Sequence, residues 1–226
     1  MKYKIIGNVV PAVEIALQRS ESLFTQSGGM SWQSEGIEMA TNARGGLLKG
    51  LGRMFSGESF FMATYTAAAD ATIAFSSTVP GSIMPIDLSQ WSNVIIQKGA
   101  FLCAEQSVNM EVAFTKKISS GLFGGEGFIL QRLSGSGMAF LEVDGDAVER
   151  TLAPGEVLKV DTGNIVAFED TMKYEVETIK GLGNIFFGGE GLFLTKITGP
   201  GKVILQTLSF GDLAGRILAL APAKSS

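Results

Sequence analysis

The sequence predicts an all-β protein built from three related units in tandem. Its 29 glycines lie between short apolar runs, as in proteins with many short strands and tight turns. Segments such as Val157–Asp161 and Lys173–Thr178 alternate apolar and polar residues, a pattern typical of half-buried strands. In addition, a loop containing glycine and glutamate, followed by an apolar strand, occurs three times along the chain.

The repeated loop is clearest in GLFGGEGFIL (121–130) and FFGGEGLFL (186–194), with a weaker copy in FSGESFFM (55–62). The glutamates recur at intervals of about 65 residues, and each directly follows a glycine. Three apolar residues begin two positions after each glutamate. The candidate loop residues are Gly57, Glu58, Gly125, Glu126, Gly189 and Glu190.

Two further landmarks keep the same order and a similar interval. One is a glycine ahead of an apolar run, and the other is a short strand that contains a glutamate. The glycines are Gly28, Gly99 and Gly163, and the glutamates are Glu38, Glu111 and Glu175. The landmarks predict three β units that share strands, followed by a tail; the approximate ranges are 1–75, 76–140, 141–212 and 213–226.

A single unit of about 65 residues buries too little surface to be stable alone, whereas fused units share a core and hide their strand edges. Within the third unit, Asp144-Gly145 lies between two strand-like runs and predicts a tight hairpin. The C-terminal LAGRILALAPAKSS fits either a last strand or a short helix.

The loops, together with GGLLKGLGRMFSGESFF, resemble the family named for altered inheritance of mitochondria protein twenty-four, over about residues 3–210. The resemblance implies a shortened double-stranded β-helix, similar to the subunit of the tryptophan RNA-binding attenuation protein. It implies three such units per chain, related by pseudo-threefold symmetry. It also implies trimers that form a nine-unit ring.

The composition excludes several kinds of chemistry. The chain has no histidine, which removes histidine-based acid–base catalysis, histidine-containing triads and histidine-ligated metals, including those of cupins. Its one cysteine, Cys103, lies in the apolar run AFLCA, where a buried thiol is expected. The net charge of −4 argues against a nucleic-acid partner. We expect no cofactor, no metal site and no enzymatic activity.

The glycine loops do not match a nucleotide-binding motif. A P-loop needs a Lys-Ser or Lys-Thr pair before a helix, and here the loops lead into strands. The glycines are therefore expected to permit turns. The three loop glutamates either converge to bind a hard cation or accept hydrogen bonds that fix their own loops, and we favour the second role.

The segment 42–55 combines apolar residues at helical spacing with basic residues. It is a candidate for contact with an anionic membrane surface or for packing at an interface, and its glycines favour packing. The residues concerned are Arg44, Leu47, Leu48, Lys49, Leu51 and Arg53. For Trp32 and Trp91, in apolar surroundings, we expect packing in a core or an interface.

Together these features favour a non-enzymatic, self-associating β scaffold that binds a protein or a membrane surface. The alternative is a ring that binds a small ligand or RNA, by analogy with the attenuation protein. The N-terminus does not resemble a signal peptide, and no apolar run reaches the length of a membrane-spanning helix, so we expect a cytoplasmic location. The charged fraction of 18% is low, as expected if part of the surface is covered in an oligomer.

Overall fold

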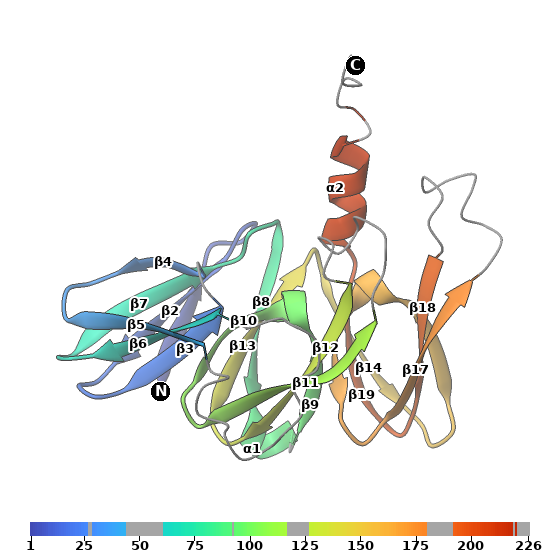
Figure 1. Cartoon of the computed structure of the whole chain (residues 1–226), viewed down its shortest axis with the longest axis horizontal. Coiled ribbons are helices and arrows are strands. Elements are labelled where there is room, and N and C mark those ends of the chain that lie inside the picture. The colour runs from blue at the N-terminus through green and yellow to red at the C-terminus, as the bar shows by residue number, and fades with distance from the viewer. Residues whose placement is uncertain are drawn as a thin grey trace. The chain divides into compact units, whose positions relative to one another are not determined.

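The structure is a computed structural model that describes residues 1–26, 29–43, 61–91, 93–116, 127–179, 192–218 and 220. These residues form four antiparallel sheets with a few short helices (Figure 1). The prediction of an all-β protein is confirmed. The chain divides into two compact units, each of which contains two of the sheets.

The first unit comprises Met1–Gln90, Phe101–Asn109 and Gly135–Glu142. Its four-stranded sheet has the order β1-β2-β7-β4, with β1 (Lys2–Ile6), β2 (Ala12–Leu17), β7 (Ala71–Ser76) and β4 (Met30–Gln33). Its six-stranded sheet has the order β5-β6-β3-β10-β13-β8, with β5 (Ile37–Ala43), β6 (Phe61–Ala67), β3 (Ser22–Gln26), β10 (Phe101–Glu105), β13 (Met138–Asp144) and β8 (Gly81–Asp87).

The second unit comprises Trp91–Ala100, Met110–Ser134 and Val143–Ser226. Its six-stranded sheet has the order β11-β12-β9-β16-β19-β14, with β11 (Val108–Lys116), β12 (Phe128–Gly135), β9 (Val94–Gln97), β16 (Ile165–Glu169), β19 (Gly201–Gln206) and β14 (Ala147–Leu152). Its three-stranded sheet has the order β15-β18-β17, with β15 (Val157–Asp161), β18 (Leu192–Thr198) and β17 (Lys173–Ile179).

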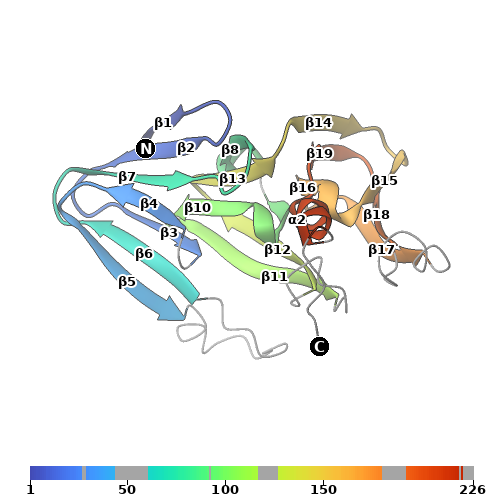
Figure 2. The same ribbon diagram turned by 90° about the horizontal axis from the view of Figure 1, so that it is seen from above.

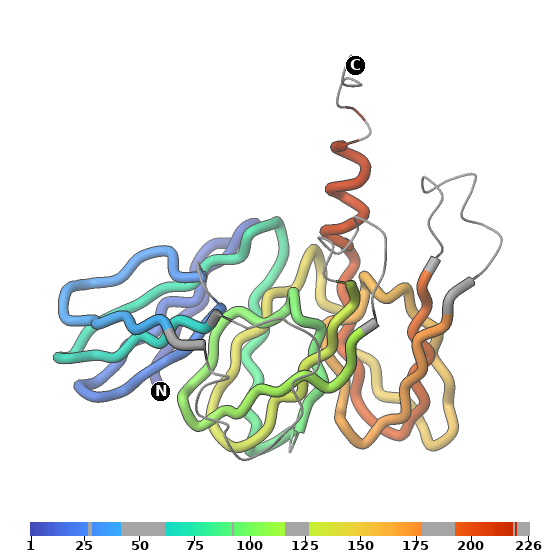
Figure 3. Tube along the Cα trace, in the orientation of Figure 1, coloured from blue at the N-terminus to red at the C-terminus, as the bar shows by residue number. Residues whose placement is uncertain are grey.

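The described helices are short. They are α1 (Leu88–Trp91), the 3-10 turns η2 (Lys98–Ala100) and η4 (Thr162–Asn164), and α2 (Phe210–Leu218). The C-terminal segment, which fits either a strand or a helix by sequence, therefore contains a helix, drawn in red in Figure 3. Its first turn carries Asp212 and its last turn carries Arg216, the charge order that suits the helix dipole.

Each unit has an apolar core contributed by both of its sheets. In the first unit, β2 buries Val13, Ile15 and Leu17, while Ala16 between them is exposed, because successive side chains of a strand point to opposite faces. Their core also includes Phe75 on β7 and residues of the six-stranded sheet. In the second unit the core residues include Ile95, Phe128, Leu130, Val160, Phe168, Ile197 and Val203.

The strand pairings recur along the chain. In the set β2–β7, β7 lies between β2 and β4, and β6 lies between β3 and β5. The set β8–β13 has the corresponding pairings, with β13 between β8 and β10 and β12 between β9 and β11. The set β14–β19 has them again, with β19 between β14 and β16 and β18 between β15 and β17. Consecutive sets are joined through β3–β10 and β9–β16.

A local irregularity recurs with the pairings. The register of β4 shifts between Met30 and Trp32, that of β10 between Phe101 and Cys103, and that of β16 between Ile165 and Ala167. Each shift begins two residues after one of the landmark glycines Gly28, Gly99 and Gly163. Gly99 and Gly163 lie in the 3-10 turns η2 and η4, and Gly28 lies outside the described residues.

The hairpin predicted at Asp144-Gly145 is wrong, because β13 and β14 belong to different sheets. Gly145 does adopt a turn, with φ of 71°. The backbone groups around the turn, however, bond to the segment after β19: Asp144 O accepts from Leu208 N, and Asp146 O accepts from Thr207 N, each at 3.1 Å. The residues that hydrogen-bond to this turn are distant in sequence, and the Asp144-Gly145 dipeptide does not specify them.

The first-unit core provides a test of packing. We expect Phe75→Ala to lower the free energy of unfolding by about 3–5 kcal/mol, because a fully buried aromatic ring is lost and a cavity remains. Urea denaturation measures this loss, and Val9→Ala, at an exposed site, is the matched control. A loss below about 1 kcal/mol would contradict this packing.

Candidate functional site

All the loop and segment residues singled out by sequence lie outside the described residues. They are Gly57, Glu58, Gly125, Glu126, Gly189, Glu190, Arg44, Leu47, Leu48, Lys49, Leu51 and Arg53. The structure does describe the strand ends next to two of these segments. Ala43 lies opposite Phe61, and Ile179 lies opposite Leu192, so residues 44–60 and 180–191 each connect two paired strands.

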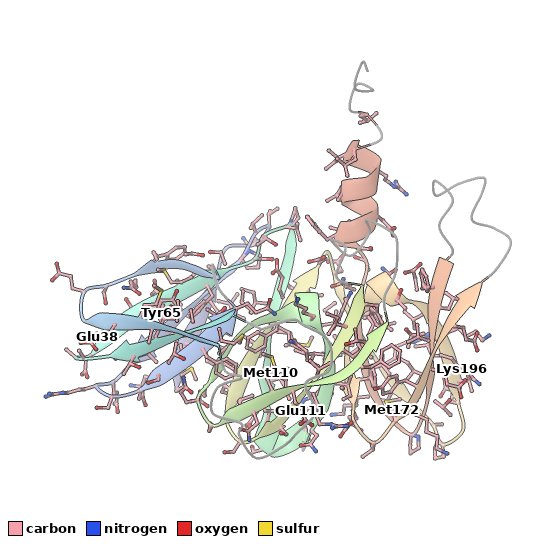
Figure 4. The ribbon with its side chains drawn as sticks, in the orientation of Figure 1. Glu38, Tyr65, Met110, Glu111, Met172 and Lys196 are labelled. Atoms are coloured by element: carbon pink, nitrogen blue, oxygen red, sulfur yellow. The ribbon has the colours of Figure 1, made fainter. Side chains whose placement is uncertain are left out.

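Arg132 on β12 is held by two carboxylates of the second unit. Its Nε and Nη2 donate to Asp170 at 2.9 and 3.1 Å, and its Nη1 donates to Glu111 on β11 at 2.7 Å. Figure 4 labels Glu111 on its strand. Hydrogen bonds to Asp170 and then Glu111 raise the pKa of Arg132. The two-pronged geometry fixes the guanidinium, so this cluster links neighbouring segments.

Lysines make corresponding contacts on the three-stranded sheet. Lys196 on β18 lies 3.7 Å from Glu175, and Lys159 on β15 lies 3.1 Å from Glu177 (Lys196 is labelled in Figure 4). Both glutamates lie on β17. These pairs are partly exposed, so each contributes at most about 1 kcal/mol. They orient side chains across the sheet more than they stabilise it.

Glu142 is a carboxylate with only 8% exposure, and its Oε1 is bonded within its own unit. Its Oε1 accepts from Ser77 Oγ at 2.7 Å, from Thr78 N at 2.5 Å and from Thr78 Oγ1 at 3.0 Å. The chain that leads into β8 is thereby attached to β13. A carboxylate used in this way is a structural acceptor.

Gln206 plays the matching part in the second unit. Its Oε1 accepts from Asp144 N at 3.0 Å, just before β14, and its Nε2 donates to Gly163 O at 2.9 Å. Glu142 is on β13 and Gln206 is on β19, which are corresponding strands of successive sets. Each side chain therefore holds the segment that leads into the first strand of its own set, β8 or β14.

Two further side chains with a reactive group, Cys103 and Tyr174, are shielded by burial. Cys103 is completely buried, and burial raises its pKa well above the ordinary value for a thiol, as expected from its apolar context. Burial also raises the pKa of Tyr174. Among the residues that the structure covers, no group of three or more Cys, Asp or Glu side chains is arranged to hold a metal ion. None of the described helices is long and apolar enough to cross a membrane.

Two edge strands stand out because their corresponding strands are buried between neighbours. β4 ends the first sheet beside β7 (Figure 2), and its Trp32 is 44% exposed. The corresponding strands β10 and β16 are paired on both sides, and Cys103 and Ala167 there are fully buried. The position of Trp32 in an apolar sequence gave a signal for an interface, but its place at an open edge became visible only in the fold.

The second open edge is β15, which pairs with β18 alone in the described sheets. Its Val157 is 48% exposed, whereas the corresponding strands β3 and β9 lie between two neighbours and are largely buried. Asp161 at the end of β15 accepts from Gly163 N at 2.9 Å. Burial, and then the charge of Asp212, raise the pKa of Asp161 above its usual range despite that hydrogen bond.

Helix α2 presents a third exposed apolar surface. Phe210, Ile217 and Leu218 are exposed, and none of the residues of α2 is buried. Leu220, just beyond the helix, is also exposed. Sequence alone left the form of this segment open, so its apolar face was not anticipated.

Comparison with known proteins gives a family and a fold. The model of the family described as "AIM24: Mitochondrial biogenesis AIM24" matches residues 3–208. An uncharacterized protein of Streptococcus pyogenes serotype M6 is 28% identical over 224 residues, which cover 96% of this chain and 89% of that protein. A crystal structure of a Streptococcus pyogenes protein has a TM-score of 0.78 and 25% identity, covering 97% of this chain and 99% of that one.

The Glu142 contacts lead to a stability prediction. We expect Glu142→Ala to lower the free energy of unfolding by about 1.5–3 kcal/mol, because buried donors lose a charged acceptor. Glu142→Gln keeps an acceptor oxygen, so a smaller loss is expected. Urea unfolding measures both, with the exposed Glu149→Ala as the control. Equal losses for the two Glu142 variants would contradict the role of its Oε1.

Burial of Cys103 leads to a second prediction. The thiol should remain unmodified by a water-soluble disulfide reagent in the native protein, because it is both inaccessible and protonated. Full reaction is expected in denaturant. The measurement is the absorbance of the released thiolate over time. Rapid stoichiometric reaction of the native protein would contradict this placement.

Proposed function

Because the chain belongs to the AIM24 family, matched over nearly its whole length, we propose that it is a non-enzymatic scaffold that self-associates into a β ring. Each chain supplies three tandem units of a short double-stranded β-helix, and three chains make the ring. The ring presents exposed apolar surfaces to a protein or a membrane surface.

The observation that carries this proposal is the recurrence of the strand pairings. The sets β2–β7, β8–β13 and β14–β19 have the same internal partners, with the same register shift after corresponding glycines. Most consecutive strands of a set also alternate between two sheets, as in a double-stranded β-helix. Independent folding of unrelated segments would not produce this agreement at several levels.

The use of polar side chains supports a non-enzymatic role. Glu142 and Gln206 bind backbone groups, and Arg132 is shared by two carboxylates. Cys103 is buried with a raised pKa. A catalytic site needs groups whose pKa and access suit a reaction, whereas these groups serve the fold.

The exposed face of α2 supports contact with a partner. Phe210, Ile217 and Leu218 are large apolar side chains of one helix, all exposed. Isolated exposed apolar residues are ordinary, but several on one short helix form the kind of patch that a partner covers. Arg216 in the last turn adds a basic group beside this patch.

The first test is the mass of the assembly. Light scattering on a gel-filtration column should give three times the chain mass of 23.9 kDa. A monomer at concentrations well above micromolar would contradict the scaffold proposal. A different closed number of copies would correct the ring size.

The second test separates the two classes of partner. Co-flotation with vesicles that contain phosphatidylserine, lost in Ile217→Asp and retained in the control Val148→Asp, supports a membrane surface. No flotation contradicts the membrane role and leaves a protein partner. Single-stranded RNA should not bind at low salt, because the net charge is −4.

A further inference from the structure

We infer that β4 of one copy pairs antiparallel with β15 of the next copy, so that a single continuous sheet crosses the contact between chains. This inference rests on the proposed self-association and specifies its contact. It is drawn from the two strand edges that lack the neighbour found at every corresponding strand within the chain.

The chain already contains this contact twice. β10 pairs antiparallel with β3, and β16 pairs antiparallel with β9. In each case the third strand of one set, which carries the register shift, lies beside the second strand of the preceding set. By correspondence, in the described sheets β15 lacks the strand of a following set and β4 lacks the strand of a preceding set. A second copy supplies both.

The burial of the two strands supports the inference. The described residues of β4 are half-buried or exposed, whereas β10 and β16 are almost wholly buried. On β15, Lys159 is exposed at the position where β3 and β9 bury Phe24 and Ile95. A strand that is paired on one side and exposed to solvent along its other edge is suited to gain a neighbour there.

Edge protection points to the same pair. The edge strands of sheets usually carry charged residues or proline, which prevent pairing with a further strand. Among the edge strands of the described sheets, β4 (MSWQ) is the one that has neither. On β15, the ammonium of Lys159 reaches Glu177, which lies on the far side of β18 from the open edge. The ammonium of Lys159 is thus directed away from the open edge, and Asp161, at the end of β15, accepts from Gly163 N.

The register follows from the two internal copies of the contact. Cys103 lies opposite Thr25 in the first, and Ala167 lies opposite Ile96 in the second. Cys103 and Ala167 come directly after the register shift of their strands, as Trp32 does in β4. Trp32 therefore takes the same place in the contact between chains.

The partner of Trp32 is identified in the same way. Thr25 pairs with Ala63, Ile96 with Gln131, and Val160 with Thr195. Residues 63, 131 and 195 lie at the same distance after the three loop glutamates. Val160 thus corresponds to Thr25 and Ile96, and all three are buried. Trp32 of one copy lies opposite Val160 of the next, and Gln33 lies opposite Lys159.

This register has a packing consequence. Val160 belongs to the apolar core of the second unit, and Cys103, at the position of Trp32, belongs to the core of the first. An indole placed opposite Val160 would extend the second-unit core across the contact between chains. The exposed Trp32 is accounted for by this role, and its indole N–H already bonds to Glu14 Oε2 at 3.4 Å.

Cysteine cross-linking tests the pairing. Gln33→Cys and Lys159→Cys chains, co-expressed with different tags and oxidised, should form a disulfide-linked dimer that contains both tags. Directly opposite residues of antiparallel strands are close enough for a disulfide. Either variant expressed alone should remain uncross-linked, because the two edges of the contact differ. Buried Cys103 is present in every sample and is controlled by the single variants.

A second variant tests the energetics of the same contact. Trp32→Asp should reduce the solution mass to that of one chain, with the circular dichroism of the wild type. Met39→Asp, at an exposed apolar residue of edge strand β5, is the matched control and should keep the assembly intact.

The outcomes separate this inference from the proposed function. A monomeric wild-type protein would overturn both. An oligomer that gives no mixed cross-link, or one whose Gln33→Cys or Lys159→Cys chains link to themselves, would overturn the β4–β15 contact and leave self-association in place. An intact Trp32→Asp oligomer would also overturn the contact.

Discussion

A strand inside a sheet needs a neighbour on both sides, since its backbone N–H and C=O groups point to both edges. In this chain that requirement explains how successive sets of strands are joined. β3 is completed by β10 from the following set, and β9 by β16. The strands of β8–β13 consequently divide between the two compact units, because each half pairs with a different neighbouring set. Among the described strands, β4 and β15 lack, on one side, the neighbour that their corresponding strands have.

Polar side chains also stabilise this arrangement, by holding the segments between strands. Short strands that alternate between sheets need their connecting segments held in place, and side-chain acceptors do this. Glu142 and Gln206 hold the starts of β8 and β14. Glu105 likewise accepts from Met138 N at 2.6 Å, and Ser34 Oγ accepts from Thr72 N at 2.9 Å, at the beginnings of β13 and β7. Replacing any of these acceptors leaves a backbone donor without its partner.

The sequence was informative where local pattern decides structure. Glycine content and alternation predicted the strands, and the apolar run around Cys103 predicted its burial. The register between strands that are distant in sequence was harder to predict. By sequence, Glu38 aligns with Glu175. In the fold, Glu38 lies opposite Thr66 and Glu175 lies opposite Lys196, and these two pairs differ in register by two residues. Connections of different length between the paired strands obscure that offset. The open edges were missed because edge status depends on which strand lies next to each, and spacing does not encode it.

The lone sulfhydryl of this polypeptide sits at Cys103 with no accessible surface, and the sequence holds no second one. Glutathione disulfide and other oxidants act on thiolates that they are able to reach. Strand pairing and apolar packing, which hold the described sheets together, are insensitive to redox potential. Such a polypeptide is suited to compartments of either redox poise, reducing or oxidising, because its fold neither needs nor loses a disulfide.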